Sequence, residues 1–359
     1  MDAGRFILAA VACLSIAGTC PAAIPYGLDK FYERNIREGF QDIPSLPATL
    51  TRKETLEMPV VRKPLWHGVC LYKLSYNERL FGEGNGRHRI CMVVIDWPKT
   101  RGQVSLKIAK DPELNRHRPS DLMMDNPNCI ATFNGFYHLT EDPSRPYFPE
   151  RIEGEVYESI DRHHPLGSVV AGFDSIVCFD PFQPPVFGSA RHEDLAPLTN
   201  RLTYAGCDGI PRSDRPTSNP RLINQNLTAH QAERNRRFRL HSDVFAGHNR
   251  TNDVTVVFTV DRRPDDSYVG ITYAEAEWFL MQFGICPGWT VGLDAGGSTL
   301  CATKRLSADY VPYDDEHGGY HPYRVWDEAV VENEPRDDHV HISERKVLTA
   351  LQIIVDDRK

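Results

Sequence analysis

Apolar and polar side chains alternate along several segments of the chain, a pattern typical of β-strands with one buried face. The clearest case is residues 103–109, and residues 67–74 and 128–137 are further predicted strands. Residues 89–96 and 253–261 are apolar almost without interruption, which predicts strands in buried positions. Other predicted strands cover residues 168–172, 175–179, 290–294 and 346–355. The chain is therefore predicted to be rich in β-structure.

One segment, residues 272–283, carries the signals of a helix instead. Thr272 can cap its N-terminus, Glu275 stands at the reciprocal position of a capping box, and Gly284 is typical of the left-handed residue that ends a helix. The 26 prolines and 25 glycines favour turns over helices, and the Pro- and Asn-rich residues 181–220 are predicted to be irregular. The predicted fold class is α+β, a mixed, β-rich core with helices packed on it.

Residues 1–23 have the features of a secretory signal peptide. A short positive start precedes residues 6–17, which are almost entirely apolar but too few to span a bilayer. The alternatives are a buried N-terminal element or a lipoprotein anchor at Cys20. Residues 24–65 are interpreted as an N-terminal extension and residues 66–359 as one domain. We therefore expect a protein that is secreted or lies in the periplasm or cell envelope, with no transmembrane segment after signal removal.

Charge and cysteine content narrow the partners and the chemistry. The formal net charge is -8, and an acidic chain gains nothing from the field of a polyanion, which argues against a nucleic-acid partner. Of nine cysteines, seven follow the predicted signal peptide, and this odd number leaves at least one unpaired or in an intermolecular bond. None has the C-x-x-C spacing of a zinc ribbon or redox motif, so most are predicted to be small core residues.

The strongest candidate chemistry lies at the end of the predicted strand 290–294. Its sequence continues Leu293-Asp-Ala-Gly-Gly-Ser-Thr299, so a carboxylate at a strand end is followed by two glycines. Glycines allow a sharp turn and a close approach of the backbone to a ligand, and successive N–H groups in such a turn can bind an anion. This suits a phosphate or a sugar oxygen held beside a carboxylate. A tight turn capped by Asp294 is the alternative.

Four further short segments combine with this turn into a set of motifs. They are Val260-Asp-Arg-Arg263, Gly270-Ile-Thr-Tyr-Ala-Glu-Ala-Glu277, Glu344-Arg-Lys-Val-Leu-Thr-Ala-Leu351 and, upstream, Thr132-Phe-Asn-Gly-Phe-Tyr137. Together with the glycine turn they resemble the phosphodiester glycosidase family over roughly residues 90–357. The resemblance implies the fold of that family and hydrolysis of the bond between an anomeric sugar carbon and a phosphate that also esterifies another group.

Two positions depart from the pattern of that family. Ala295 stands where the first of three glycines is expected, and Asp243 stands where the resemblance implies an arginine that would recognise phosphate. Arg239 is four residues before Asp243, so on an extended strand it would face the same side and could take that role.

The resemblance implies roles for particular residues. Asp294 would be the key carboxylate, as a base for water or an electrostatic stabiliser, and Asp261 the second carboxylate. The predicted substrate-binding residues are Asn134, Gly135, Arg239, Asp243, Arg263, Gly296, Gly297, Ser298 and Thr299. Among them Arg263 and the amides of the glycine turn would hold phosphate, and Asn134 would orient sugar hydroxyls. Alternatively, Asp261 and Arg263 form a turn-stabilising pair, and Asn134 is a turn residue that satisfies backbone groups.

Histidines raise the question of a metal. His339 and His341, alternate residues that would face one way on a strand, could ligate Zn²⁺, although acidic, histidine-bearing loops are usually only solvated. We predict no cofactor and no metal site. The chain has no H-E-x-x-H, Walker or G-x-S-x-G motif, so the sequence does not support a metalloprotease, a nucleoside triphosphatase or an α/β-hydrolase.

The hypothesis that follows is a secreted glycosidase that cleaves a sugar-1-phosphodiester in a glycan or envelope polymer. The expected partner is thus a carbohydrate or sugar-phosphate substrate. The alternatives are a glycoside hydrolase for a non-phosphorylated sugar and a non-catalytic carbohydrate-binding or envelope protein.

Overall fold

The computed structural model describes a little over half of the chain. The described residues are 43–77, 80, 87–111, 113, 115–136, 150–153, 155–157, 175–188, 203–209, 243–262, 268–295, 299–304, 329–333 and 346–356. The predicted signal peptide and the predicted strand 168–172 lie outside them. Within the described part, no helix combines the length and the apolar character needed to cross a membrane.

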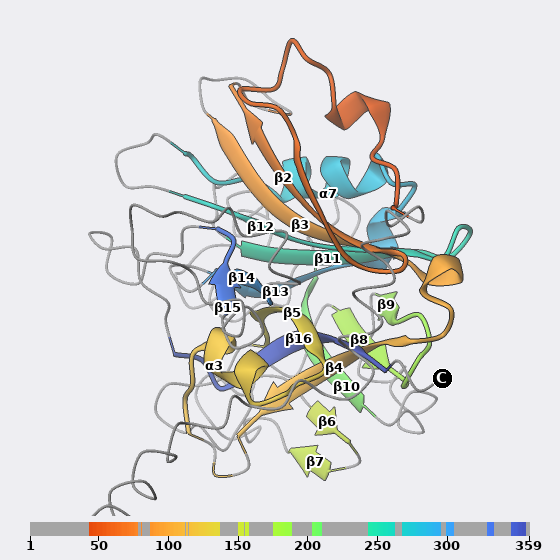
Figure 1. Cartoon of the computed structure of the whole chain (residues 1–359), viewed down its shortest axis with the longest axis vertical. Coiled ribbons are helices and arrows are strands. Elements are labelled where there is room, and N and C mark those ends of the chain that lie inside the picture. Colours follow the sequence, from red (N-terminus) through yellow and green to blue (C-terminus); the bar gives the residue numbers. More distant parts are fainter. Residues whose placement is uncertain are drawn as a thin grey trace, which may run out of the picture.

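Two antiparallel sheets form the body of the protein (Figure 1). The large sheet has the strand order β1-β2-β3-β12-β11-β13-β10-β6-β7, with β8 added on β10 and β9 on β8. Its strands are β1 (Val61–Trp66), β2 (Val69–Tyr76), β3 (His88–Asp96), β6 (Glu150–Ile152), β7 (Glu155–Tyr157), β8 (Ser175–Phe179), β9 (Val186–Gly188), β10 (Thr203–Gly209), β11 (Asp243–Asn249), β12 (Val254–Val260) and β13 (Thr290–Ala295).

The small sheet has the order β15-β14-β5-β16-β4. Its strands are β4 (Val104–Lys110), β5 (Cys129–Asn134), β14 (Cys301–Lys304), β15 (Ala329–Val331) and β16 (Thr349–Val355). Single-turn 3₁₀ segments are η1 (Ala48–Leu50), η2 (Trp97–Thr100) and η4 (Pro287–Trp289).

The large sheet is buried on both faces at its centre. On one face Val93 and Val257 pack with Phe133 of the small sheet, in a cluster that we call the inter-sheet core. On the other face Met92 and Phe258 pack with residues of α7 (Tyr273–Met281). Strands covered on both sides need apolar residues at every position, which explains the unbroken apolar runs of β3 and β12.

Helix α7 begins as its sequence predicts. The Thr272 hydroxyl accepts a hydrogen bond from the Glu275 N–H at 3.2 Å, and the Glu275 carboxylate accepts one from the Thr272 N–H at 2.9 Å, which completes the capping box. Gly284 follows the helix with φ +71°, where a side chain would be strained.

The expected β-rich core is present, but the described residues do not support helices as a large part of the packing. The described residues form two α-helices, α7 and the six-residue α3 (Pro119–Met124) on the small sheet. The physical reason is that the two sheets cover each other, so strands bury most of the apolar surface that helices would otherwise cover.

The prediction that residues 181–220 are irregular is wrong in part, because β9 and β10 fall within them. Pro184 and Pro185 immediately precede β9, which among the described strands pairs only with β8, at the border of the sheet. Proline is tolerated at such a position because an edge strand needs fewer N–H donors.

Of the predicted N-terminal extension, residues 43–65 are described, and they lie against the α7 face of the large sheet. The Tyr76 hydroxyl donates to the Leu50 carbonyl at 2.9 Å, and the Tyr72 hydroxyl donates to the Pro44 carbonyl. The last five of these residues belong to β1.

The prediction that most cysteines are core residues is confirmed, and no disulfide occurs among the described residues. Those that are buried are Cys70, Cys91, Cys129, Cys178 and Cys301. Burial raises the pKa of the Cys70 and Cys129 thiols to about 12, so both are inert thiols at neutral pH.

Candidate functional site

Three neighbouring strands of the large sheet, β11, β12 and β13, have chain ends that lie side by side. Strand β11 is antiparallel to both β12 and β13, so its first residue lies beside their last residues. Asp243 pairs with Ala295, which puts their Cα atoms roughly 5 Å apart, and Asp261 follows β12 directly. The pairing is irregular between Asp243 and Phe245, as is common where a strand redirects side chains. We call this edge of the large sheet the open end of the β11–β12 hairpin.

Asp294, the predicted key carboxylate, is placed at the open end through its backbone alone. It is the penultimate residue of β13, next to the Ala295 that pairs with Asp243. The following residues Gly296, Gly297 and Ser298 lie outside the described residues, and the chain is described again from Thr299.

Asp261 is 3 % exposed and held from two directions. Its Oδ1 accepts a hydrogen bond from Asn333 Nδ2 at 2.9 Å, and its Oδ2 lies 3.7 Å from Nε of Arg89. Its N–H also donates to the Arg89 carbonyl at 3.1 Å. The guanidinium of Arg89 lies 5.8 Å from the centre of the Tyr268 ring, so the cation is placed between a carboxylate and an aromatic face.

Asp243 lies on the opposite face of the large sheet from Asp261. Its Oδ2 accepts a hydrogen bond from the Tyr273 hydroxyl at 3.0 Å, on the side of α7, and its Oδ1 accepts one from the Val244 N–H at 2.8 Å. Asp261, by contrast, is bonded from the side of the inter-sheet core. The structure therefore brings the two backbones together but directs the two carboxylates to different layers.

Asn134 is the last residue of β5 in the small sheet, and Gly135 follows it directly. Asn134 is fully buried, and among the described residues neither its Oδ1 nor its Nδ2 has a hydrogen-bond partner. Because Phe133 before it faces the inter-sheet core, strand alternation puts Asn134 on the other face of that sheet. A Cβ on Gly135 would come within 2.5 Å of Thr349 Oγ1, so glycine is required for this close approach.

Thr299 is buried and lies at the same end of the small sheet as Asn134. It comes two residues before Cys301, which pairs with Phe133 in the neighbouring strand. The carbonyl of Thr299 accepts a hydrogen bond from Asn333 Nδ2 at 2.8 Å. The far side of the glycine turn is thus tied to the same side chain that holds Asp261.

Sequence reasoning missed Asn333, Arg89 and Tyr273, which supply the partners of the two carboxylates. Asn333 stands in Val-Glu-Asn-Glu-Pro, which carries no motif, and Arg89 opens a strand that reads as ordinary core. Tyr273 falls inside the predicted helix, but its partner is identified only by the packing of α7 on β11. No local signal could have found any of the three.

The other predicted residues, Arg239, Arg263, His339 and His341, lie outside the described residues. In the part of the chain that is described, no three His, Cys, Asp or Glu side chains gather as metal ligands would.

The fold and this site define a β-rich domain with two buried acidic residues, Asp243 and Asp261, at neighbouring strand ends. No family model matches the chain, and no curated protein matches its sequence. Solved structures do share the fold. One is the catalytic domain of zebrafish N-acetylglucosamine-1-phosphodiester alpha-N-acetylglucosaminidase, auto-inhibited by its pro-peptide, with a TM-score of 0.54 and 12% identity over 82% of this chain and 84% of that chain. Another is a Burkholderia pseudomallei protein designated as exported, with a TM-score of 0.54 and 10% identity over 87% of this chain and 98% of that one. At these identities the likeness establishes a shared fold.

Proposed function

We propose that the chain is an exported hydrolase that cleaves the sugar–phosphate bond of a sugar-1-phosphodiester. The observation that carries the proposal is that β12 and β13 both end beside Asp243, the first residue of β11, so that the backbones of Asp261 and Asp294 are close. The fold is also shared with the catalytic domain of an enzyme whose name describes this reaction. Fold alone supports function only by association, so the proposal depends on the residues at the edge.

In the proposed reaction, water attacks the anomeric carbon while the bond from that carbon to the phosphate oxygen breaks. The oxygen leaves with the bonding electrons as part of a phosphate monoester, and Asp294 takes the proton of the attacking water. The transition state resembles an oxocarbenium ion, which a nearby carboxylate stabilises. Backbone N–H groups of residues 296–298 would bind the departing phosphate oxygens.

Arg89 is the described cation that suits the charge of this substrate. Asp243 occupies the position where the resemblance implies an arginine, so a phosphate at this edge needs positive charge from elsewhere. The Arg89 side chain is 28% exposed and lies 3.7 Å from Asp261, so it can face solvent beside a carboxylate that it helps to keep ionised. We propose that Asp261 and Arg89 act together, the first toward the sugar carbon and the second toward the phosphate.

Asn134 is also proposed to bind the sugar, which requires the sugar to reach the face of the small sheet that points away from the inter-sheet core. A buried amide with both polar atoms unpaired is destabilising, and native proteins seldom leave such groups without a protein, water or ligand partner. A sugar hydroxyl can both donate and accept, which matches the two halves of the amide.

A glycoside hydrolase for a non-phosphorylated sugar is the second candidate, and the observation that favours it is Asp243. The Tyr273 hydroxyl holds that carboxylate inside the protein, so position 243 offers no positive charge for a phosphate.

A substrate panel tests both proposals. The protein without residues 1–23 is incubated with sugar-1-phosphodiesters of several hexoses and with the matching aryl glycosides, and released sugar is measured by chromatography. Release from the phosphodiesters alone supports the first proposal, and release from the aryl glycosides alone supports the second. Binding of the sugars by calorimetry without any release would reject both and leave a carbohydrate-binding protein.

A further inference from the structure

The side chain of Asn333 connects parts of the candidate site that belong to different sheets. Its Nδ2 donates to Asp261 Oδ1 at 2.9 Å and to the Thr299 carbonyl at 2.8 Å, and its Oδ1 accepts from the Cys301 N–H at 2.8 Å. Asp261 follows β12 of the large sheet, whereas Thr299 and Cys301 lead into β14 of the small sheet. The side-chain amide of Asn333 therefore links the Asp261 carboxylate to Thr299, the first described residue after the glycine sequence.

The chemistry of these three partners fixes the orientation of the amide. A carboxylate and a carbonyl can only accept, and a backbone N–H can only donate. Exchanging Oδ1 and Nδ2 of Asn333 would set oxygen against two acceptors and N–H groups against a donor. Aspartate at this position could not donate to Asp261, and a hydroxyl residue has one donor where two are used. Asparagine is thus suited to this bridge in a way that smaller polar residues are not.

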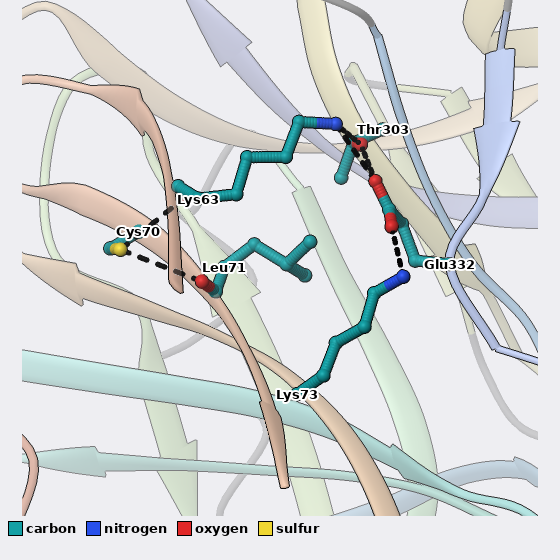
Figure 2. A network of polar contacts seen from close by, with 6 residues as sticks. All are labelled: Lys63, Cys70, Leu71, Lys73, Thr303 and Glu332. Atoms are coloured by element: carbon teal, nitrogen blue, oxygen red, sulfur yellow. Dashed lines mark hydrogen bonds and ion pairs between the residues drawn. The ribbon is translucent and has the colours of Figure 1, made fainter. Parts of the chain in front are cut away.

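Glu332, the residue before Asn333, is bonded to two lysines and a threonine, as Figure 2 shows. Its Oε1 lies 2.8 Å from Nζ of Lys63 and 2.5 Å from the Thr303 hydroxyl, and its Oε2 lies 2.5 Å from Nζ of Lys73. The lysines come from β1 and β2 of the large sheet and Thr303 comes from β14 of the small sheet. Burial opposes ionisation, but the two ammonium groups overcome it and hold the pKa of Glu332 below its usual range.

The backbone completes the anchoring, because the Glu332 N–H donates to the Cys301 carbonyl at 2.8 Å while the Cys301 N–H donates to Asn333. Glu332 and Asn333 are 5 % and 6 % exposed, so both are fixed from several sides. Their polar atoms bond to residues of the two sheets and to Asp261.

We propose that Asn333 is a positioning residue for the reaction, held in place by Glu332. It fixes the Asp261 carboxylate relative to Thr299 and β14, and it favours the ionised form of Asp261 by donating to it. This inference rests on the proposed function, because it assigns Asn333 to the same site. Asn333 acts through Asp261 and does not itself take part in bond breaking.

The test compares Asn333→Ala with Asn249→Ala. Asn249 is a matched control, since it is 5 % exposed and its side chain also makes three bonds, to Phe283, Thr251 and Asn252. It ends β11 at the side away from Asp243, about 20 Å from the open end. Both variants should lose stability to a similar extent.

Only Asn333→Ala should change the site. We expect kcat to fall about 10- to 100-fold with a smaller change in KM, since a positioning residue acts mainly on the transition state. Loss of a donor to Asp261 should also move the acid limb of the pH–rate profile to higher pH. If Asn333→Ala and Asn249→Ala have the same kcat and the same pH profile, Asn333 has a structural role only and the proposal is wrong.

A titration separates this outcome from failure of the proposed function. The Asp261 carboxyl is followed by ¹³C NMR in protein with labelled aspartate, and its signal is assigned by comparison with Asp261→Asn. Its pKa should be higher in Asn333→Ala than in the native chain and unchanged in Asn249→Ala. This readout holds even if no substrate of the panel is cleaved, and an unchanged Asp261 pKa in Asn333→Ala would overturn the inference. Asn333→Ser, which keeps one donor, takes the place of Asn333→Ala if the alanine variant does not fold.

Discussion

The two ends of the β11–β12 hairpin use polar side chains in different ways. At the turn, Asn249 accepts hydrogen bonds from the N–H groups of Thr251 and Asn252, two and three residues along the chain. At the open end, Asp243 is bonded to a tyrosine 30 residues away and Asp261 to an asparagine 72 residues away. The polar residues of the turn serve the local backbone, as turn residues commonly do.

The carboxylates of Asp243 and Asp261 are instead held by side chains from remote segments, although Asp243 also accepts a hydrogen bond from the Val244 N–H. Both are buried, and burial of a carboxylate is unfavourable unless other groups compensate for it. The chain supplies that compensation from remote segments, which is expected where a charge is kept for function rather than for the turn itself. The comparison predicts that equal substitutions at the two ends have unequal effects on activity.

The largest difference is expected for Asp294→Asn. If Asp294 takes the proton of the attacking water, the amide cannot replace it, and kcat should fall at least about 1000-fold. The matched control is Asp253→Asn in the turn, where φ is +51° and asparagine is well tolerated. Sugar release is measured for both variants beside unfolding in urea. Normal activity of a folded Asp294→Asn protein would remove this residue from the mechanism.

Glu332→Gln should give the next largest effect, on stability. Glu332 is buried between Lys63 and Lys73, and removing its charge leaves two ammonium groups without their partner, which should cost about 2 kcal/mol at pH 7. This expected cost is smaller than the cost for fully buried ion pairs because both lysines are partly exposed. Urea unfolding at pH 7 measures the difference in the free energy of unfolding.

The pH dependence of this effect has a definite sign. In the unfolded chain Glu332 titrates near the ordinary value of about 4.3, and in the folded chain its pKa is lower. Between these values the unfolded state binds more protons, so the contribution of Glu332 to stability is complete above about pH 4.3 and is lost as the pH falls through the folded pKa. The native chain and Glu332→Gln should therefore converge in stability as the pH is lowered below 4.3. A constant difference down to pH 3 would contradict the ion-pair explanation.

The sequence predicted the open end better than it predicted its partners. Strand periodicity and the unbroken apolar run of β12 located Asp261, and the capping box located α7, because these signals lie within a few residues. Asn333, Arg89 and Tyr273 reach the site only through sheet register and packing, which bring together residues far apart in sequence. Asp243 shows the same limit, since its departure from the expected arginine has a physical explanation only once the Tyr273 hydroxyl is seen beside it.

Arg89→Ala should have an intermediate effect and should depend on the substrate. Loss of one charge-assisted contact is expected to lower kcat/KM about 10- to 100-fold for a sugar-1-phosphodiester. The loss should be smaller for a neutral aryl glycoside if Arg89 faces the phosphate. The control is Arg87→Ala, since Arg87 is more exposed and pairs with Glu57 at 2.9 Å. Equal losses with both substrates would show that Arg89 acts through Asp261 alone.

Tyr273→Phe should have the smallest effect on activity, because Tyr273 contacts Asp243 on the α7 face of the large sheet, opposite to Asp261. It removes the hydroxyl that donates to Asp243 Oδ2 at 3.0 Å and leaves that buried carboxylate with its bond to the Val244 N–H. Stability should fall by about 1–2 kcal/mol, since a hydrogen bond to a buried charge is lost while the ring still packs 5.5 Å from that of Phe245. Activity per folded molecule should change by less than about fivefold, because a barrier change of 1 kcal/mol already corresponds to that factor.

The variant Asp243→Asn allows the interaction between Asp243 and Tyr273 to be tested directly. An amide is cheaper to bury than a carboxylate, so in the Tyr273→Phe background Asp243→Asn should restore part of the lost stability. Urea unfolding of the two single variants and the double variant gives the coupling between the two side chains. If instead Tyr273→Phe folds normally and loses most of its activity, Asp243 belongs to the reaction centre. The two faces of the large sheet would then have to be treated as one site, and the difference drawn between Asp243 and Asp261 would be wrong.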